Sequence, residues 1–332
     1  MSIKRKNRLS IDALYKGVLS GDKVTLSRAI TLTESTLSED QELATELIEK
    51  LLPYTGNTIR IGITGVPGVG KSTFIEALGV KITSNKKKLA VLAIDPTSQR
   101  SGGSILGDKT RMETLSSNPM AYIRPSSSQD KLGGVANKTR EAMLLCEAAG
   151  YEVIFIETVG VGQSEVAVKG MVDFFLLLML AGAGDELQGI KKGIMEMADG
   201  IAITKADGNN IKSAKMAKTE YTNALHLFPP SDSGWYPKVH TCSSLTDEGI
   251  EDVWNMIKNQ VKHMKANGYF STNRESQNTQ WMDNIIIEQL KSDFYSKKEI
   301  KSTINNIKNE IRDGKISPKI GANILLQTYF KK

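Results

Sequence analysis

Cysteine and histidine are scarce in this sequence. Its 332 residues include two cysteines, Cys146 and Cys242, and three histidines. The cysteines stand far apart, and neither belongs to a CxxC pair or has histidine at metal-ligand spacing. A disulfide framework and a metal cluster are therefore not expected, and a reducing cytoplasm is the compartment that this composition favours.

Long apolar runs are missing as well. The most apolar stretch, Phe174 to Leu180, is far shorter than the roughly 20 residues that are needed to cross a bilayer. The first residues are basic, but no apolar run follows them, so no signal peptide is expected. We therefore expect no membrane partner.

Positive charge is in excess but is not gathered in one place. The net charge is +6, and the isoelectric point is near 9.0. Lysine and arginine cluster at the N-terminus, at Lys86 to Lys88 and along the C-terminal tail. Such scatter is typical of solvated faces rather than of a stripe that binds nucleic acid, so no nucleic acid partner is expected.

Helical spacing dominates residues 1–55. Apolar residues recur at that spacing around Leu14 and again around Leu47, and Pro53 ends the second run. We therefore expect an N-terminal helical region here.

From residue 56 to residue 265, short β-rich runs alternate with helical segments. Several runs are apolar on both faces, as the strands of a covered parallel sheet must be. The alternation predicts an α/β domain with βαβ winding and a mainly parallel sheet. The expected strands are Ile59–Thr64, Leu89–Ile94, Tyr151–Ile156, Phe174–Leu180, Gly200–Thr204 and Lys238–Cys242.

Residues 266–332 form the third expected part, a linker followed by a helical, lysine-rich dimerisation region. The polar segment Ser271 to Gln280 is interpreted as the linker. A second copy of the chain could cover the apolar residues behind it, although the sequence does not show whether the tail alone makes a dimer. These residues include Trp281, Ile285, Ile286 and Leu290.

A phosphate-binding sequence follows the first expected strand and opens a helix, the context in which such a motif is credible. It matches GxxxxGK[ST] in full and consists of Gly65, Val66, Pro67, Gly68, Val69, Gly70, Lys71, Ser72 and Thr73. The glycines let backbone N–H groups surround a β-phosphate. Lys71 would bridge the β- and γ-phosphates, and the Ser72 hydroxyl would bind Mg²⁺.

Two expected strands are followed by a carboxylate, Asp95 in one case and Glu157 in the other. Both should project at the carboxyl end of the sheet, where ligands of open α/β sheets bind. We interpret them as metal-holding groups rather than as strand caps. The stretch from Glu157 to Gly160 also resembles the DxxG element of G proteins, in which the Gly160 N–H would contact the γ-phosphate.

The segment Thr204-Lys205-Ala206-Asp207 closes another expected strand and resembles the guanine-selecting NKxD element. Asp207 would accept hydrogen bonds from the guanine N1–H and N2–H₂ groups, and the Lys205 stem would cover the base. Thr204 stands where asparagine is usual, so a weaker tie to the phosphate loop is expected. The loop that would contact guanine O6 through its backbone contains Ser243, Ser244 and Leu245.

Longer stretches carry a more specific resemblance: Asp95–Ser98 with Gly102–Met112, Glu157–Glu165, and Gly184–Glu196. Together they resemble the MeaB/ArgK family of P-loop GTPases, the G-protein chaperones of adenosylcobalamin-dependent methylmalonyl-CoA mutase. The resemblance is clear over residues 10–265 and extends to the tail in outline. It implies a homodimer with a SIMIBI-class G domain that binds GTP or GDP with Mg²⁺ and protects its mutase or reloads it with cofactor.

The resemblance also implies roles for single residues. Asp95 and Asp108 would lie near Mg²⁺ and the γ-phosphate in switch I, and Glu157 would lie near the metal in switch II. The third stretch corresponds to a mobile loop that contacts the mutase, with Gln188, Lys191 and Lys192 as candidate contacts. A solvated helix face is the alternative reading of the two lysines.

The expected reaction is hydrolysis of GTP to GDP and phosphate. Lys71 and Mg²⁺ would supply positive charge, and either Asp108 or Asp95 would orient the attacking water. Arg111 is the candidate for an arginine finger. With no clearer one, slow intrinsic turnover is expected, raised when a partner orders the switches.

Two other functions stay open at this point. One is a kinase or ATPase linked to amino-acid (LAO/AO) transport, and the other is a metal-insertion GTPase. Asp207 argues against ATP as the nucleotide. The histidines are scattered, which argues against metal insertion.

Overall fold

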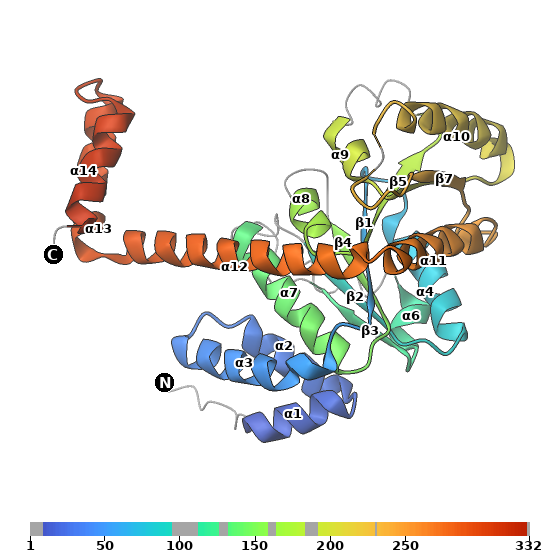
Figure 1. Ribbon diagram of the computed structural model, residues 1–332, viewed down its shortest axis with the longest axis horizontal. Helices are drawn as coiled ribbons and strands as arrows, with labels where there is room; N and C mark the ends of the chain where they lie inside the picture. The colour runs from blue at the N-terminus through green and yellow to red at the C-terminus, as the bar shows by residue number, and fades with distance from the viewer. Residues whose placement is uncertain are drawn as a thin grey trace. The chain divides into compact units, whose positions relative to one another are not determined.

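The computed structural model describes residues 9–94, 112–125, 132–158, 164–182, 192–229 and 231–330. The chain forms two compact units, Met1–Gln277 and Asn278–Lys332. The first unit is an α/β domain on one seven-stranded sheet, and the second is helical (Figure 1).

The sheet is parallel throughout, with the strand order β3-β2-β4-β1-β5-β6-β7. All the predicted strands are present, with ends shifted by two residues or fewer, which confirms the α/β class. The edge strand β3 is the one that the sequence pattern misses, because only two of its four residues are buried. The strands are β1 (Ile59–Gly65), β2 (Leu89–Ile94), β3 (Ala121–Arg124), β4 (Val153–Thr158), β5 (Phe174–Leu180), β6 (Gly200–Thr204) and β7 (Lys238–Thr241).

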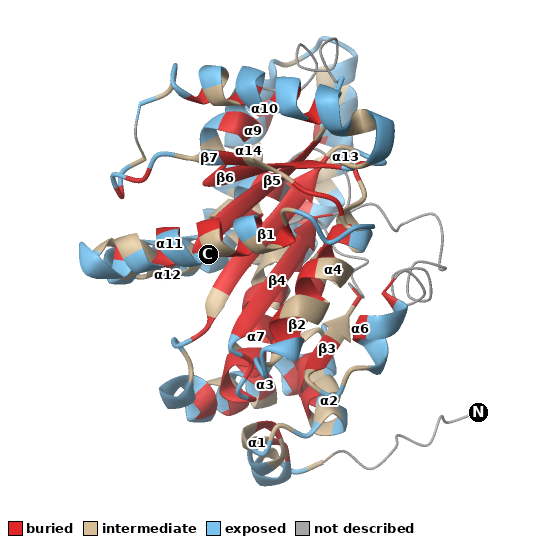
Figure 2. Cartoon of the chain, turned by 90° about the vertical axis from the view of Figure 1, so that its right-hand side faces the viewer, coloured by how far each residue is buried: buried red, intermediate tan, exposed pale blue. Residues whose placement is uncertain are grey.

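The strands are apolar because helices cover both faces of the sheet. In β4, Ile154 and Ile156 join one core cluster, whereas Val153 and Phe155 join the cluster on the opposite face. This alternation follows from the two-residue period of a strand. Figure 2 shows the central strands buried along most of their length.

The helices fall into groups according to the cluster they help to build. One group packs with β2 and β4 and comprises α1 (Ile11–Leu19), α2 (Lys23–Thr33), α3 (Ser38–Leu51), α7 (Leu132–Ala148) and α8 (Ser164–Lys169). The same face continues over β5 to β7 with α9 (Lys192–Met197) and α10 (Ile211–Leu225). The opposite face carries α4 (Lys71–Ser84), α6 (Glu113–Ser117) and α11 (Ile250–Ala266).

The described part of residues 1–55 is mainly helical, as the sequence predicts, and α1 and α2 begin at polar caps. The Ser10 hydroxyl accepts a hydrogen bond from the Ala13 N–H at 3.2 Å, and Asp22 accepts from the Thr25 N–H at 2.8 Å. Each bond satisfies a backbone donor that the first helical turn leaves open. Pro53 lies in the short 3₁₀ helix η1 (Leu52–Tyr54) that follows α3.

The interpretation of Ser271 to Gln280 as a linker is wrong, because these residues lie inside the long helix α12 (Tyr269–Ser296). Their polarity serves buried hydrogen bonds rather than solvation. Arg274 donates to Asp173 Oδ1 at 2.9 Å and to Oδ2 at 2.8 Å, and the Gln277 side chain donates to the Val172 carbonyl at 2.8 Å. These bonds fix the first turns of α12 to the residues that directly precede β5.

Replacing Arg274 by alanine should lower the free energy of unfolding by about 3 kcal/mol, because it leaves a buried carboxylate without its charge partner. The Asp173 side chain is 1% exposed, and the Arg274 side chain 11% exposed. Urea unfolding followed by circular dichroism measures the loss. Lys297→Ala, which removes an exposed ion pair with Asp293, is the control and should change stability little.

The second unit is built by the end of α12 with α13 (Lys298–Arg312) and α14 (Pro318–Phe330). A side chain on Gly321 would come within 3 Å of Ile307 and Ile311, so glycine permits the close approach of α14 to α13. The Tyr329 hydroxyl donates to Asp293 at 2.7 Å. Several apolar side chains of α12 are nevertheless exposed, among them Ile285, Ile286 and Leu290.

None of the helices in the described ranges combines the length and the apolar character that a bilayer crossing requires.

Candidate functional site

Parallel strands bring their carboxyl ends to one end of the sheet, and the predicted site residues follow several of these strands. β1 and α4 flank the predicted phosphate loop, which confirms the strand and the helix expected around the motif. Gly68 and Gly70 have φ values of 79° and 90°, a left-handed conformation that glycine adopts at little cost. Lys71, Ser72 and Thr73 form the first turn of α4, whose free N–H groups can bind an anion.

The amine of Lys71 lies over the backbone of this loop. Its Nζ atom donates to the Gly65 carbonyl at 2.8 Å and to the Val66 carbonyl at 3.5 Å. Burial lowers the pKa of the Lys71 amine, and the carboxylates of Glu157 and Glu165 oppose that shift. The Lys71 amine is therefore held against the backbone at the start of the loop, and the carboxylates of Glu157 and Glu165 are close enough to act on its pKa.

Glu157 lies inside β4 rather than after it, since the strand continues to Thr158. Its neighbours in register are Ile63 on β1 and Ala93 on β2, and it is 5% exposed. The Thr158 hydroxyl donates to the Thr64 hydroxyl at 2.8 Å, which joins the ends of β4 and β1. The structure thus brings a buried carboxylate next to the strand that enters the phosphate loop.

Glu165 is a buried acid near the phosphate loop to which the sequence motifs assign no role. It lies in α8 with no exposed surface, and its charge acts on Lys71. The sequence could have indicated this residue, because Glu165 is the last residue of the stretch Glu157–Glu165 that carries the family resemblance.

Several predicted site residues lie outside the described residues: Asp95, Asp108, Arg111, Gly160, Gln188 and Lys191. Lys192 begins α9, but the position of its side chain is outside the description as well. Among the described residues, no three histidine, cysteine, aspartate or glutamate side chains converge on one point as a protein-only metal site would require.

Thr204 ties the end of β6 to the phosphate loop. Its hydroxyl lies 2.7 Å from the Val69 carbonyl and 3.2 Å from the Met179 carbonyl. The tie to the phosphate loop is thus present with threonine at this position. A β-branched hydroxyl on a buried strand end is held in place by its surroundings and can reach the loop without the longer amide of asparagine.

The two predicted base loops are joined to each other. Ser243 is fully buried, and its hydroxyl donates to Asp207 Oδ2 at 2.5 Å. The Ser243 Oγ atom also accepts from the backbone N–H groups of Leu245 and Thr246, at 3.2 and 3.3 Å. Ser243 thus fixes one oxygen of the Asp207 carboxylate and organises its own turn.

Lys205 lies beside the phosphate loop. Its backbone φ is 55°, and its Cε atom is 3.9 Å from the position that a Cβ of Gly70 would take. The lysine stem therefore runs from the end of β6 toward the last glycine of the loop. A carboxylate and an aliphatic stem after β6, with a phosphate loop after β1 on the other side of β5, can together hold a nucleotide.

The chain matches a known protein family along most of its length. A family model described as methylmalonyl Co-A mutase-associated GTPase MeaB matches residues 26–299. A putative GTPase of Caulobacter vibrioides is 47% identical, and the match covers 97% of this chain and 98% of that protein. GTPase ArgK of Escherichia coli is 42% identical, with 95% of each chain covered.

A mouse relative and a solved structure extend the comparison. The mouse protein named methylmalonic aciduria type A homolog, mitochondrial, is 43% identical over 98% of this chain and 80% of its own length. The crystal structure of a protein named LAO/AO transport system kinase superposes with a TM-score of 0.77. It is 36% identical to this chain, and the match covers 97% of this chain and 98% of that one.

Proposed function

Because this chain belongs to the MeaB family of P-loop GTPases, we propose that it is a GTP-driven switch acting as chaperone of an adenosylcobalamin-dependent acyl-CoA mutase. Hydrolysis of GTP is the activity of its named relatives. The observation that carries the proposal is the family match over residues 26–299, described as mutase-associated. The role we assign is protection of the mutase or reloading with cofactor.

In this proposal the phosphate loop, from Gly65 to Thr73, surrounds the β-phosphate with backbone N–H groups. Lys71 bridges the β- and γ-phosphates, and Gly160 contacts the γ-phosphate. Asp207 selects guanine with the help of Ser243, and Lys205 covers the base. The geometry supports this assignment because Lys71, Lys205 and Asp207 follow β1 and β6, the two strands that flank β5, and the Thr204–Val69 bond joins these two ends of the site.

Mg²⁺ is the cation that suits the residues present. The donors at this end of the sheet are oxygen atoms, the Ser72 hydroxyl at the start of α4 and the buried Glu157 carboxylate, and hard cations prefer such ligands. Since no protein-only cage exists in the described part of the chain, phosphate oxygens would complete the set, with Asp95 and Asp108 as further candidates. When bound, the ion would neutralise charge developing on the phosphates.

Hydrolysis then needs an oriented water and positive charge near the γ-phosphate. We assign the charge to Lys71 and the water-orienting role to Asp108 or Asp95. Lys71 is well suited because the carbonyls of the loop hold its amine in place, and the charges of Glu157 and Glu165 favour its protonated form. We expect slow turnover by the chain itself and faster turnover when the mutase engages Gln188, Lys191 and Lys192.

A kinase or ATPase of amino-acid transport is the main competing function, and the name of the solved relative keeps it in view. Asp207 favours guanine over adenine, since adenine has no N1–H or N2–H₂ group to offer a carboxylate. A metal-insertion GTPase is the other competitor. The described residues offer no histidine or cysteine cluster to support it.

Mixing the purified chain with the cobalamin mutase of the same cell should raise GTP turnover at least about tenfold, well short of the 10³–10⁵ that an arginine finger in trans supplies. Phosphate release measures the effect, and pull-down from the native cell identifies the mutase. The same mutase boiled before mixing is the control. No complex and no acceleration with any cobalamin mutase of that cell would refute the chaperone role while leaving the GTPase intact.

We also propose that the protein is a homodimer whose contact includes the apolar stripe of α12. Met282, Ile285, Ile286 and Leu290 lie within one side of the helix by their spacing and are 44–60% exposed. Burying each such side chain would contribute roughly 1.5–3 kcal/mol. Exposed apolar residues in this number are typical of a protein interface.

Replacing Leu290 by glutamate should weaken the dimer by at least about tenfold, because one charge would be buried in an apolar contact. Sedimentation equilibrium measures the dissociation constant. Asn284→Glu is the matched control, since Asn284 lies on the opposite side of the same helix and is exposed. If both variants dimerise like the parent chain, the contact is elsewhere.

A further inference from the structure

A cavity lies at the end of the sheet opposite the phosphate loop, wholly within the first unit. Its volume is about 510 Å³. Asp173, Asp199 and Pro237 line it, and each directly precedes a strand: β5, β6 and β7. Because the strands are parallel, this is the amino-terminal end of the sheet, so the cavity is separate from the nucleotide site.

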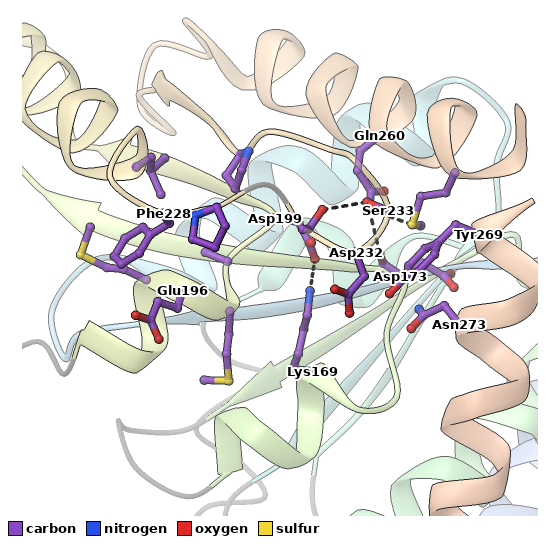
Figure 3. A pocket seen from close by; sticks show the side chains of 18 residues that line it. Lys169, Asp173, Glu196, Asp199, Phe228, Asp232, Ser233, Gln260, Tyr269 and Asn273 are labelled. Atoms are coloured by element: carbon purple, nitrogen blue, oxygen red, sulfur yellow. Dashed lines mark hydrogen bonds and ion pairs between the residues drawn. The ribbon is translucent and has the colours of Figure 1, made fainter. Parts of the chain in front are cut away.

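One side of the cavity carries Phe228 and Glu196, and the other side is polar (Figure 3). The lining also contains the apolar side chains of Met195 and Leu225. Asp232, Tyr269 and Asn273 lie together on the other side, away from Phe228 (Figure 3). The Lys169 side chain points in from α8, between these two sides (Figure 3). A volume of this size falls within the range of about 300–1,000 Å³ that is usual for small-molecule sites.

The carboxylates of the polar side are not equally engaged. Asp173 is held by Arg274, and Asp199 Oδ2 accepts from Lys169 Nζ at 2.6 Å and from the Phe175 N–H at 2.7 Å. Asp232 is exposed, and it has no hydrogen bond or ion pair with another described residue. The single amine in the lining is therefore already paired, whereas one carboxylate is unengaged.

Gln260 contributes a buried acceptor, its Oε1 atom, that has no donor among the described residues. Its side chain is buried, with 1% of the residue exposed, and extends from α11 toward Ser233 and Asp173 (Figure 3). The Nε2 atom donates to the Asp173 carbonyl at 3.2 Å, but the buried Oε1 atom has no hydrogen-bond partner among the described residues. Buried polar atoms are nearly always paired, so an orphan of this kind in a cavity wall points to a bound donor.

The pKa of the Tyr269 hydroxyl is also affected by the negative charges at this side of the cavity. Burial raises the pKa of this hydroxyl, and the charges of Asp232 and Asp199 raise it further. Both carboxylates therefore act on the space in front of the ring. A cation would be favoured in that space and an anion disfavoured.

We propose that this cavity binds a small organic cation, an ammonium group carried on an apolar body. The ammonium would donate to Asp232 and to Gln260 Oε1, and the body would pack against Met195, Leu225 and Phe228. Ammonium supplies donors and no acceptor, which matches the Asp232 carboxylate and the Gln260 Oε1 atom. The inference does not depend on the mutase partner or on the nucleotide roles proposed above.

The test uses the full chain and 2-phenylethylammonium as the probe, with neutral 2-phenylethanol for comparison. The Trp235 indole N–H is the reporter, because it donates to the Asp199 carbonyl at 2.9 Å. Neither Trp235 nor Trp254 lines the cavity, but Trp235 is bonded to Asp199, which does, so Trp254 is the internal reference. In a ¹⁵N spectrum of the tryptophan indoles, 2-phenylethylammonium should shift the Trp235 resonance in a saturable way and leave the Trp254 resonance unchanged. Its affinity should be at least about fivefold higher than that of the alcohol.

Asp232→Asn should weaken probe binding by about fivefold, whereas Glu220→Gln, an exposed acid on α10 outside the lining, should not. The proposal is overturned if the alcohol binds as well as the ammonium, or if Asp232→Asn binds like the parent. It is also overturned if the Trp235 resonance stays unshifted at probe concentrations up to about 10 mM, a range that covers the weak affinity of so small a ligand. A shift caused by a lysine-bearing peptide and not by the free probe would reassign the cavity to a protein partner.

Discussion

Replacing Lys71 by alanine should abolish measurable GTP hydrolysis, with turnover reduced by at least about 10²–10³-fold. The amine is held over the phosphate loop by the Gly65 and Val66 carbonyls, so its charge is fixed before the nucleotide arrives. In the proposed mechanism this charge offsets the negative charge that develops on the γ-phosphate oxygens. Alanine removes it and leaves nothing of similar reach in the loop.

Nucleotide binding should weaken in the same variant, because a charge-assisted hydrogen bond of about 1.5–3 kcal/mol is lost. Phosphate release measures turnover, and calorimetric titration with GDP and GTP measures affinity. Lys81→Ala is the matched control, since Lys81 lies on the same helix but forms an exposed ion pair with Glu251. Near-parental turnover in Lys71→Ala would remove the phosphate loop from the mechanism, provided that the thermal melt shows a folded protein.

Much of the fold can be predicted from the sequence because local pattern and global packing agree. β1, β2, β4, β5 and β6 are apolar runs bounded by polar residues, and burial on both faces of a sheet requires that pattern. The phosphate loop is equally visible, since its glycine spacing reflects local backbone geometry. The assignment of its residues to particular nucleotide atoms stays a prediction.

What the sequence cannot show are the contacts between segments far apart in the chain. The Thr204 hydroxyl reaches the Val69 carbonyl across 135 positions, and no local pattern announces the bond. Ser243 looks like an ordinary turn residue until the fold places it against Asp207. Arg274 and Gln277 look solvated for the same reason, because the acceptors that bury them lie more than 100 positions earlier.

The choice of base gives the second large expected effect. A carboxylate at Asp207 can accept from both N1–H and N2–H₂ of guanine, and a site built to pair polar groups can reject an unmatched base by a factor of about 10⁴. The Ser243 hydroxyl already donates to Oδ2 of this carboxylate at 2.5 Å, which fixes its plane before any base arrives. GTP should therefore bind far more tightly than ATP.

Changing Asp207 to asparagine replaces one carboxylate oxygen by an N–H₂ donor. That donor opposes the donors of guanine, but it matches the carbonyl that xanthine carries at position 2. The variant should lose GTP and gain XTP, while the phosphate loop is untouched. Thr204 supports a clean outcome, because its bonds to Val69 and Met179 hold the strand end in place during the exchange.

Two further variants separate base recognition from damage to the loops. Asp247→Asn is the matched control, since Asp247 is exposed in the neighbouring turn and its φ of 59° suits asparagine as well as aspartate. It should leave both nucleotide affinities unchanged. Ser243→Ala removes the hydrogen bond that fixes Asp207, so it should weaken GTP binding without creating affinity for XTP.

The measurement is a titration of the parent chain and the three variants with GTP, ATP and XTP under the same magnesium and salt concentrations. The guanine assignment requires both a strong preference of the parent for GTP and its exchange for XTP in Asp207→Asn alone. If the parent binds ATP as well as GTP, the base loops do not select guanine and a transport ATPase gains support. If Asp207→Asn keeps the parental preference, the carboxylate does not face the base, and its bond to Ser243 serves only to join the two loops.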